Sequence, residues 1–178
     1  MTGPLVRDAT ADDAGACAAI YAPYVLGSAA SFETEPPDAE EMARRIAAAQ
    51  QDHAWLVATR SDATVGYAYA TSWKSRAAYR WTCETSVYVA DGQHGQGLGR
   101  TLYEALLARL TERGFRTAVA GMTLPNPASA ALHTSLGFSP VGVLVRVGWK
   151  AGRWHDVALY RRGLGDLPDD APPDDHLA

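Results

Sequence analysis

Among the residues of this sequence that could do chemistry, three glycines at the start of a predicted helix come first. Gly95, Gly97 and Gly99 fall within QHGQGLGRTLYEALLARL, where leucines recur every four residues at 98, 102, 106 and 110. Glycine weakens a helix, but it lets bare backbone N–H groups approach a ligand. These groups and the helix dipole favour a phosphate. The stretch therefore indicates an anion-binding loop, with an ordinary glycine-rich connection as the alternative.

A second candidate is the segment LPNPASAALHTSLGF, which contains a histidine on a predicted helix. Asn126, Ser129 and His133 are spaced three and four residues apart and therefore share one helix face. An unperturbed histidine titrates near pH ~6.5, so His133 can give or take a proton at neutral pH. Asn126 followed by Pro127 is also typical of a plain N-cap, and a lone helix histidine is more often structural.

The elements that must position these residues alternate between strands and helices. Strands are predicted over 4–10, 54–59, 64–73, 81–90, 115–122, 140–149 and 154–162. Helices are predicted from Asp12 or Asp13, from the N-cap Asp38, from the glycine loop to Arg113, and from Asn126 to near Gly137. This order predicts an α/β (α+β) domain over 1–164, with a mixed, mostly antiparallel sheet flanked by helices. Residues 165–178 are rich in proline and aspartate and are predicted to be a disordered tail.

Composition narrows the class of protein. The net charge of -4 and pI of about 5.7 disfavour nucleic-acid binding. No apolar run approaches the ~20 residues of a membrane span, and the N-terminus has no apolar leader region. Cys17 and Cys83 lie in no CxxC or Cys/His pattern, so we expect no metal site and a reducing, cytoplasmic setting. Neither cysteine has a sequence-adjacent base, so neither is expected to be a nucleophile.

Two common phosphate loops do not fit the glycine stretch. A Walker A loop requires Gly-Lys followed by Ser or Thr, and the fingerprint GxGxxG begun at Gly95 requires a glycine where the chain has Arg100. The stretch instead resembles the pyrophosphate loop of the GNAT acetyltransferases, [Q/R]xxGxG before a long helix. His94 stands where that family usually has Gln or Arg. Because binding there is mostly through backbone, this departure is expected to be tolerated.

The resemblance extends beyond this loop. The helix segment resembles the GNAT pattern Nxx[AS]xxxYxxxGF, with His133 in place of the tyrosine. Five segments in the correct order resemble a narrower group, the phosphinothricin and methionine sulfoximine N-acetyltransferases, in which a histidine also takes that place. The segments are SFETEP, WKSRAAYRWTCETSVYV, LPN, LHTSLGF and GRWHDV, and the resemblance spans Val6 to about Gly163.

This resemblance implies the GNAT fold and direct transfer of acetyl from acetyl-CoA to a small amino-acid-like amine in a ternary complex. Phosphinothricin, methionine sulfoximine and methionine sulfone are the implied acceptors. The resemblance also implies a homodimer. It implies neither a metal nor an acyl-enzyme intermediate. The alternatives are another amine, such as a common amino acid, a polyamine or a protein N-terminus, and a non-catalytic acyl-CoA-binding module. A polyamine is disfavoured by Lys74 and Arg76, and a module by the presence of both Glu84 and His133.

By the same resemblance, Glu84 is the catalytic glutamate, whereas without those segments it would be taken as a solvated acid at a strand end. Glu84 shares a strand face with positions 86 and 88, and Thr85, 87 and 89 face the other way. His133 either shares the role of base or protonates the departing thiolate. The backbone of Val87 and Val89 is expected to pair with the pantetheine arm or polarise the acetyl carbonyl. The cofactor-binding set is Val87, Tyr88, Val89, His94, Gly95, Gln96, Gly97, Leu98, Gly99, Arg100, Asn126 and Ser129.

The predicted acceptor site is Phe32, Lys74, Arg76 and Tyr79. Arginine offers a planar fork to a carboxylate or phosphinate, lysine a point charge, and phenylalanine an apolar wall. A solvated basic loop is the alternative for the two cations. Tyr103 is predicted to be core packing. Trp154 and His155 are predicted to be structural or at a dimer interface.

Overall fold

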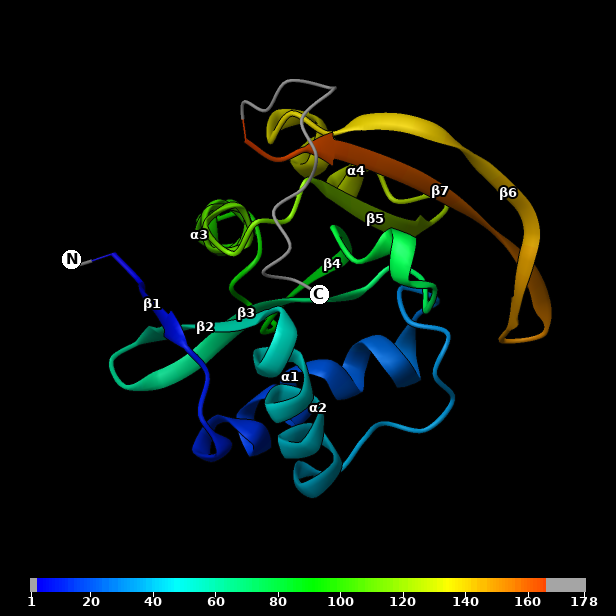
Figure 1. The fold of residues 1–178 in the computed structure, drawn as a ribbon. Helices are drawn as coiled ribbons and strands as arrows, with labels where there is room; N and C mark the ends of the chain where they lie inside the picture. Colours follow the sequence, from blue (N-terminus) through cyan, green and yellow to red (C-terminus); the bar gives the residue numbers. More distant parts are fainter. Residues whose placement is uncertain (1–2, 166–178) are drawn as a thin grey trace.

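One sheet of seven strands runs through the computed structural model, which describes residues 3–165 (Figure 1). The spatial order is β1-β2-β3-β4-β5-β7-β6, and every neighbouring pair is antiparallel except β4 and β5. This confirms the predicted mixed, mostly antiparallel sheet. The tail predicted at 165–178 lies, apart from Gly165, outside the described residues. The strands are β1 (Leu5–Asp8), β2 (Ala54–Arg60), β3 (Ala63–Ser72), β4 (Thr82–Val89), β5 (Thr117–Thr123), β6 (Ser139–Lys150) and β7 (Arg153–Gly163).

Helices cover both faces of this sheet, and each face has its own apolar core. In Figure 1, α1 and α2 lie below the sheet and α3 and α4 above it. Two short 3₁₀ segments precede α1 and β4. Within the described residues the helices are α1 (Ala14–Gly27), α2 (Ala39–Asp52), α3 (Leu98–Glu112) and α4 (Pro127–Ser135), and the 3₁₀ segments are Ala11–Asp13 and Ala77–Tyr79.

The helix signals read from the sequence are largely confirmed. The side chain of Asp38 accepts a hydrogen bond from the backbone N–H of Glu41 at 2.8 Å, so it caps α2 as predicted. The leucines at 98, 102, 106 and 110 are all buried, because residues four apart on α3 face the sheet together. α3 therefore has the amphipathic stripe that the sequence predicted, and it begins directly at the glycine loop.

The start of α1 agrees with the prediction in position but not in capping. Asp13 is the N-cap residue of the helix, which begins at Ala14 after a 3₁₀ turn, and its side chain makes no cap hydrogen bond. The carboxylate of Asp13 is used elsewhere: it accepts two hydrogen bonds from the Arg7 guanidinium, at 2.7 and 2.8 Å. Burial opposes ionisation of this carboxyl, but the hydrogen bond from Arg7 and further bonds outweigh it and lower the pKa of Asp13 to about 2. The side chain of Asp13 thus forms an ion pair with Arg7 and does not cap the helix that follows it.

The feature that positions the functional site is the early separation of β4 from β5. These parallel strands pair only from Thr82 to Glu84, after which β5 continues along β7. Backbone groups of β4 beyond Glu84 that point toward β5 therefore have no partner in the sheet ladder. Side chains alternate as predicted: Cys83 and Val89 pack in the core under α3, and Tyr88 packs against the core under α1 and α2.

Candidate active site

A cavity of about 480 Å³ opens where β4 and β5 part, between the start of α3 and α4. Residues predicted from three separate segments meet there. Glu84 and Gln96 lie outside this lining, and so do the four predicted acceptor residues. Of the predicted site residues, those that line it are Val87, Tyr88, Val89, His94, Gly95, Gly97, Leu98, Gly99, Arg100, Asn126, Ser129 and His133.

The glycine loop has the geometry of an anion cradle. Gly95 and Gly97 have φ of 73° and 78°, in the left-handed region that glycine adopts readily, and Gly97 is the N-cap of α3. A Cβ built on either glycine would meet no protein atom within 4 Å. Open space therefore lies in front of bare backbone at the positive end of a helix dipole. These features fit a pyrophosphate.

Replacing Gly97 tests this cradle. Gly97→Val should weaken acetyl-CoA binding about tenfold or more, because a branched side chain would occupy the space in front of the loop. Calorimetric titration measures the dissociation constant. Gly92→Val is the matched control: Gly92 also has a positive φ of 75° and open space around it, but it does not line the cavity. Equal affinities in the two folded variants would contradict a phosphate role for Gly97.

Gln96 lies in this loop but its side chain is turned away from the cavity. Its amide donates to the carbonyl of Gly92 at 3.1 Å and accepts from Nη1 of Arg60 at 2.9 Å. The same Nη1 donates to Oε1 of Gln93 at 2.7 Å. Arg60 at the end of β2 thus holds the loop by two side-chain hydrogen bonds on the side away from the cavity. The sequence offered no signal for this contact, because Arg60 is more than 30 residues away.

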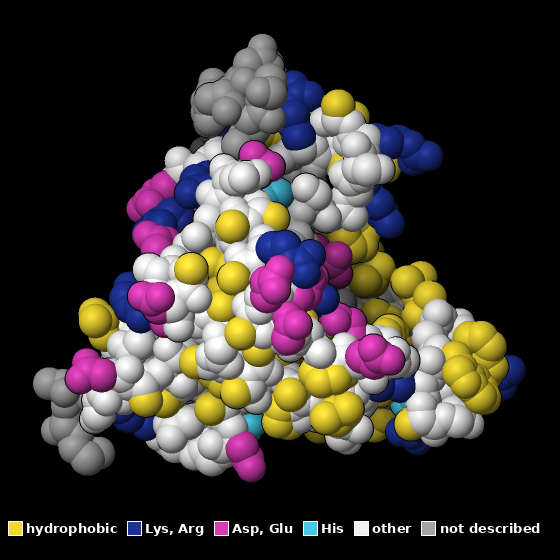
Figure 2. All heavy atoms as spheres, turned by 90° about the horizontal axis from the view of Figure 1, so that it is seen from below, with side chains coloured by type: hydrophobic (Ala, Val, Ile, Leu, Met, Phe, Trp, Pro, Cys, Tyr) yellow, Lys and Arg dark blue, Asp and Glu magenta, His cyan; other side chains and the backbone are white. Residues whose placement is uncertain are grey.

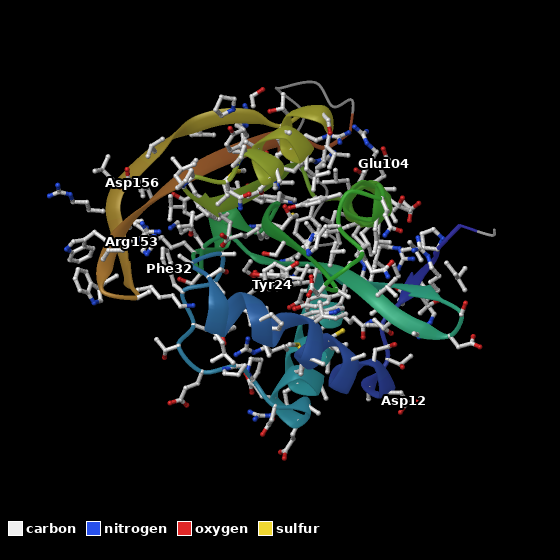
Figure 3. The ribbon with its side chains drawn as sticks, turned by 180° about the vertical axis from the view of Figure 1, so that it is seen from behind. Asp12, Tyr24, Phe32, Glu104, Arg153 and Asp156 are labelled. Atoms are coloured by element: carbon white, nitrogen blue, oxygen red, sulfur yellow. The ribbon has the colours of Figure 1, made fainter. Side chains whose placement is uncertain are left out.

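Tyr24 of α1 was not predicted, although it lines the cavity (Figure 3). Its hydroxyl donates to the carbonyl oxygen of Val89 at 2.6 Å and accepts from the Val89 N–H at 3.3 Å. These are the backbone groups predicted to pair with pantetheine. The Tyr24 hydroxyl therefore already contacts the backbone groups of Val89, whereas Val87 lines the cavity without such a side-chain contact among the described residues.

His133 is buried in the cavity wall and bonded through both ring nitrogens. Its Nδ1 lies 2.7 Å from the carbonyl oxygen of Ser129, and its Nε2 lies 2.9 Å from the hydroxyl of Tyr103. Because a carbonyl can only accept, the network assigns the proton to Nδ1, and Nε2 accepts from Tyr103. Burial lowers the pKa of His133, although the Ser129 carbonyl opposes this, so the ring is neutral at pH ~7. Tyr103 is buried in the core as predicted, and in addition it lines the cavity.

Glu84 lies just beyond the cavity lining, at the last position of β4 that pairs with β5. Its Oε1 is 3.7 Å from the place of a Cβ on Gly121, which is a lining residue. The absence of a side chain at Gly121 therefore leaves the carboxyl close to the cavity. Burial raises the pKa of Glu84, and the charge of Lys74 partly opposes this rise. A raised pKa brings a carboxylate closer to the range useful for proton transfer.

The predicted acceptor residues lie outside the cavity, and Lys74, Arg76 and Tyr79 lie in the exposed connection before β4. The Lys74 ammonium stands over the Trp73 ring, 4.6 Å from its centroid. The exposed ring of Phe32 packs against β6. The role of these four residues in acceptor binding stays a prediction.

Of the hairpin residues, His155 is buried and its Nε2 lies 3.1 Å from the carbonyl of Lys150, whereas Trp154 is exposed.

Burial raises the pKa of the Cys17 and Cys83 thiols to about 12, which disfavours thiolate chemistry. Within residues 3–165 no group of three or more potential ligands could hold a metal ion, and no helix is long and apolar enough to span a membrane.

The chain belongs to the GNAT acetyltransferase family, because residues 6–159 match the acetyltransferase (GNAT) domain. It is 41% identical over 168 residues to the phosphinothricin N-acetyltransferase of Streptomyces viridochromogenes, covering 94% of this chain and 90% of that protein. It is 38% identical over 161 residues to the L-methionine sulfoximine/L-methionine sulfone acetyltransferase of Pseudomonas paraeruginosa, covering 89% and 94%.

A solved structure agrees with these relatives. The crystal structure of a phosphinothricin acetyltransferase from Sinorhizobium meliloti in complex with AcCoA matches with a TM-score of 0.93 and 36% identity, covering 98% of this chain and 95% of that one. The predicted family, fold and enzyme class are confirmed, and acetyl-CoA is the acetyl donor of this family.

Proposed function

We propose that this acetyltransferase acetylates the amine of a small, anionic amino-acid-like acceptor, with phosphinothricin, methionine sulfoximine and methionine sulfone as the leading candidates. The observation that carries the proposal is the Glu84 carboxyl beside Gly121, at the wall of a cavity suited to acetyl-CoA. The names of the two relatives support the choice of acceptor. Lys74 and Arg76 supply positive charge near this end of β4 for an acceptor carboxylate or phosphinate.

The reaction must remove two protons from an ammonium group. Glu84 accepts the first and leaves a neutral amine, whose lone pair attacks the thioester carbonyl carbon. We assign the backbone N–H of Val87, a residue that lines the cavity, to stabilise the developing oxyanion. When the carbon–sulfur bond breaks, the second proton leaves the nitrogen. The CoA thiolate takes up one proton and becomes a thiol. We assign the donor of that proton to the hydrogen-bonded pair of the Tyr103 hydroxyl and Nε2 of His133 in the cavity wall, and the second proton that leaves the nitrogen restores the pair.

Substitution of Glu84 tests its role as base. Glu84→Gln keeps the size and removes the charge, so kcat should fall about 10²–10⁴-fold. The deficit should shrink from pH ~6 toward pH ~10, because more of the amine then arrives deprotonated. Steady-state rates across this range measure both effects, with Glu40→Gln on α2 as a charge-matched control and His133→Gln expected to lose less. Near-wild-type kcat at neutral pH would remove Glu84 from the mechanism.

The same variant has a stability signature. Burial raises the pKa of Glu84 in the folded state above its value in the unfolded chain, so wild-type stability declines as pH rises from the unfolded pKa through the folded one. Glutamine does not ionise, so Glu84→Gln should gain free energy of unfolding relative to wild type as pH rises. Urea unfolding at several pH values separates this effect from a folding defect, which would appear as a loss at every pH.

A panel of amines with acetyl-CoA tests the acceptor class by release of free thiol. We expect turnover of phosphinothricin and methionine sulfoximine and little turnover of polyamines. Arg76→Ala should raise the acceptor KM about tenfold or more, as expected for one lost charge-assisted hydrogen bond, and leave the acetyl-CoA KM nearly unchanged. Arg44→Ala, a 69% exposed arginine on α2, is the control. Preference for a common amino acid or a protein N-terminus would favour the alternative acceptors.

We also propose that the protein is a homodimer, formed through the outer face of the β6–β7 hairpin. β6 is an edge strand, and Val141, Val145 and Trp149 on it are 60%, 69% and 58% exposed. Figure 1 shows the hairpin projecting beyond the body of the sheet, and Figure 2 shows hydrophobic side chains gathered at its far end. An exposed apolar edge strand is suited to pairing with a second copy about a twofold axis.

Light scattering after size exclusion tests the dimer. Val145→Asp should convert the dimer to monomer, because it places a charge in the apolar contact. Leu5→Asp is the control, since Leu5 is a 65% exposed residue of the opposite edge strand, β1. A monomeric wild type at micromolar concentration, or equal dissociation of both variants, would contradict this interface.

We further place the enzyme in the cytoplasm, where acetyl-CoA is found, in keeping with its free, buried Cys17 and Cys83. Acetylation of phosphinothricin would give its host resistance to that herbicide.

A further inference from the structure

The end of β6 is tied to the end of α1 by one lysine. Lys150 Nζ donates to the carbonyl oxygens of Val25 and Ser31, both at 2.6 Å. Val25 lies in the last turn of α1, where carbonyls lack partners within the helix and the dipole favours a cation. Ser31 lies in the connection between α1 and α2. Lys150 therefore joins three segments that are distant in the sequence.

The connection is held firmly at this point. Ser31 is buried, and its Oγ lies 2.7 Å from the hydroxyl of Tyr21 and accepts from the N–H of Glu33 at 3.1 Å. The Glu33 carboxylate in turn accepts two hydrogen bonds from Arg45, at 2.8 and 3.1 Å. Phe32 thus lies between Ser31, whose backbone carbonyl is held by Lys150, and Glu33, whose side chain is held by Arg45.

The ring of Phe32 lies directly on β6, two residues before the lysine. A Cβ on Gly148 would come within 2.2 Å of Cζ of Phe32, so only glycine leaves room for the ring at this place. The ring centroid is 6.1 Å from that of His155. Figure 3 shows Phe32 at the side of the molecule where the hairpin carrying Arg153 and Asp156 lies. Lys150 fixes the backbone of this segment, and Gly148 receives its aromatic ring.

We propose that Lys150 is a positioning residue for the acceptor: by tying the backbone at Ser31 to the end of β6, it holds Phe32 as the apolar wall of the acceptor site. This inference rests on the proposed function and on the predicted place of Phe32 in the acceptor site. Two of the three N–H groups of the ammonium are engaged with carbonyl oxygens, which suits a tie between segments. The hydrogen bonds of Lys150 set the position of the Phe32 ring relative to the acceptor, and this position decides which acceptor side chains fit.

Kinetics of three variants test the tether. Lys150→Met removes the donors and keeps the aliphatic stem; the acceptor KM should rise about tenfold or more, with the acetyl-CoA KM changed less than about threefold. Lys150→Arg, which can still donate to both carbonyls, should recover most of this loss. Arg153→Met removes an exposed charge from the same hairpin and should match wild type. Hydrogen exchange should quicken at residues 31–33 in Lys150→Met only.

Gly148→Ala is an independent probe, because it displaces the Phe32 ring and leaves Lys150 intact. It should raise the acceptor KM in the same selective way. Turnover of anionic acceptors by wild type with an unchanged acceptor KM in Lys150→Met would overturn the positioning role alone. Equal rises in the acceptor and acetyl-CoA KM values, without recovery in Lys150→Arg, would show a general structural role and overturn it too. Failure of wild type to acetylate any anionic acceptor would instead overturn the proposed function and this inference with it.

Discussion

The separation of β4 from β5 after Glu84 is the constraint on which the rest of the site depends. A parallel pair needs a crossover, and α3 supplies it, so this helix begins at the end of β4 where the strands part. The parting leaves backbone groups of β4 without ladder partners, and unpaired buried backbone is costly. Those groups either bind a ligand or find a side chain, as Val89 does with Tyr24. One irregularity in the sheet thus yields both a strand edge for an extended ligand and a helix N-terminus for its phosphates.

Burial acts on the two titratable groups of the site in the same physical sense. It raises the pKa of Glu84 and lowers that of His133, because in each case low polarity disfavours the charged form. An acid and a base with opposite charges are thereby both shifted toward neutrality. The two occupy different positions, Glu84 beside Gly121 and His133 against Tyr103. This division suits a reaction that removes one proton from a nitrogen and delivers another to a sulfur.

The β6–β7 hairpin takes part in both of the proposed contacts outside the cavity. Its inner side meets the α1–α2 connection through Lys150 and Gly148, and its outer side is an apolar edge. The proposed acceptor wall and the proposed dimer contact therefore belong to one element. The two strands pair on both sides of an irregularity between Leu144 and Gly148.

The sequence by itself determined the order of the elements, the amphipathic stripe of α3, the cap of α2 and the position of the glycine loop. These follow from local spacing and local hydrogen bonds, and resemblance to the GNAT family added Glu84 and His133. Only the tertiary structure decided that Gln96 turns toward Arg60, that Asp13 pairs with Arg7, and that the Tyr24 and Tyr103 hydroxyls enter the site. The physical reason is that each of these contacts depends on a side chain's neighbour in space. Tyr24 and Val89 are 65 residues apart, and no periodicity within either segment encodes their meeting.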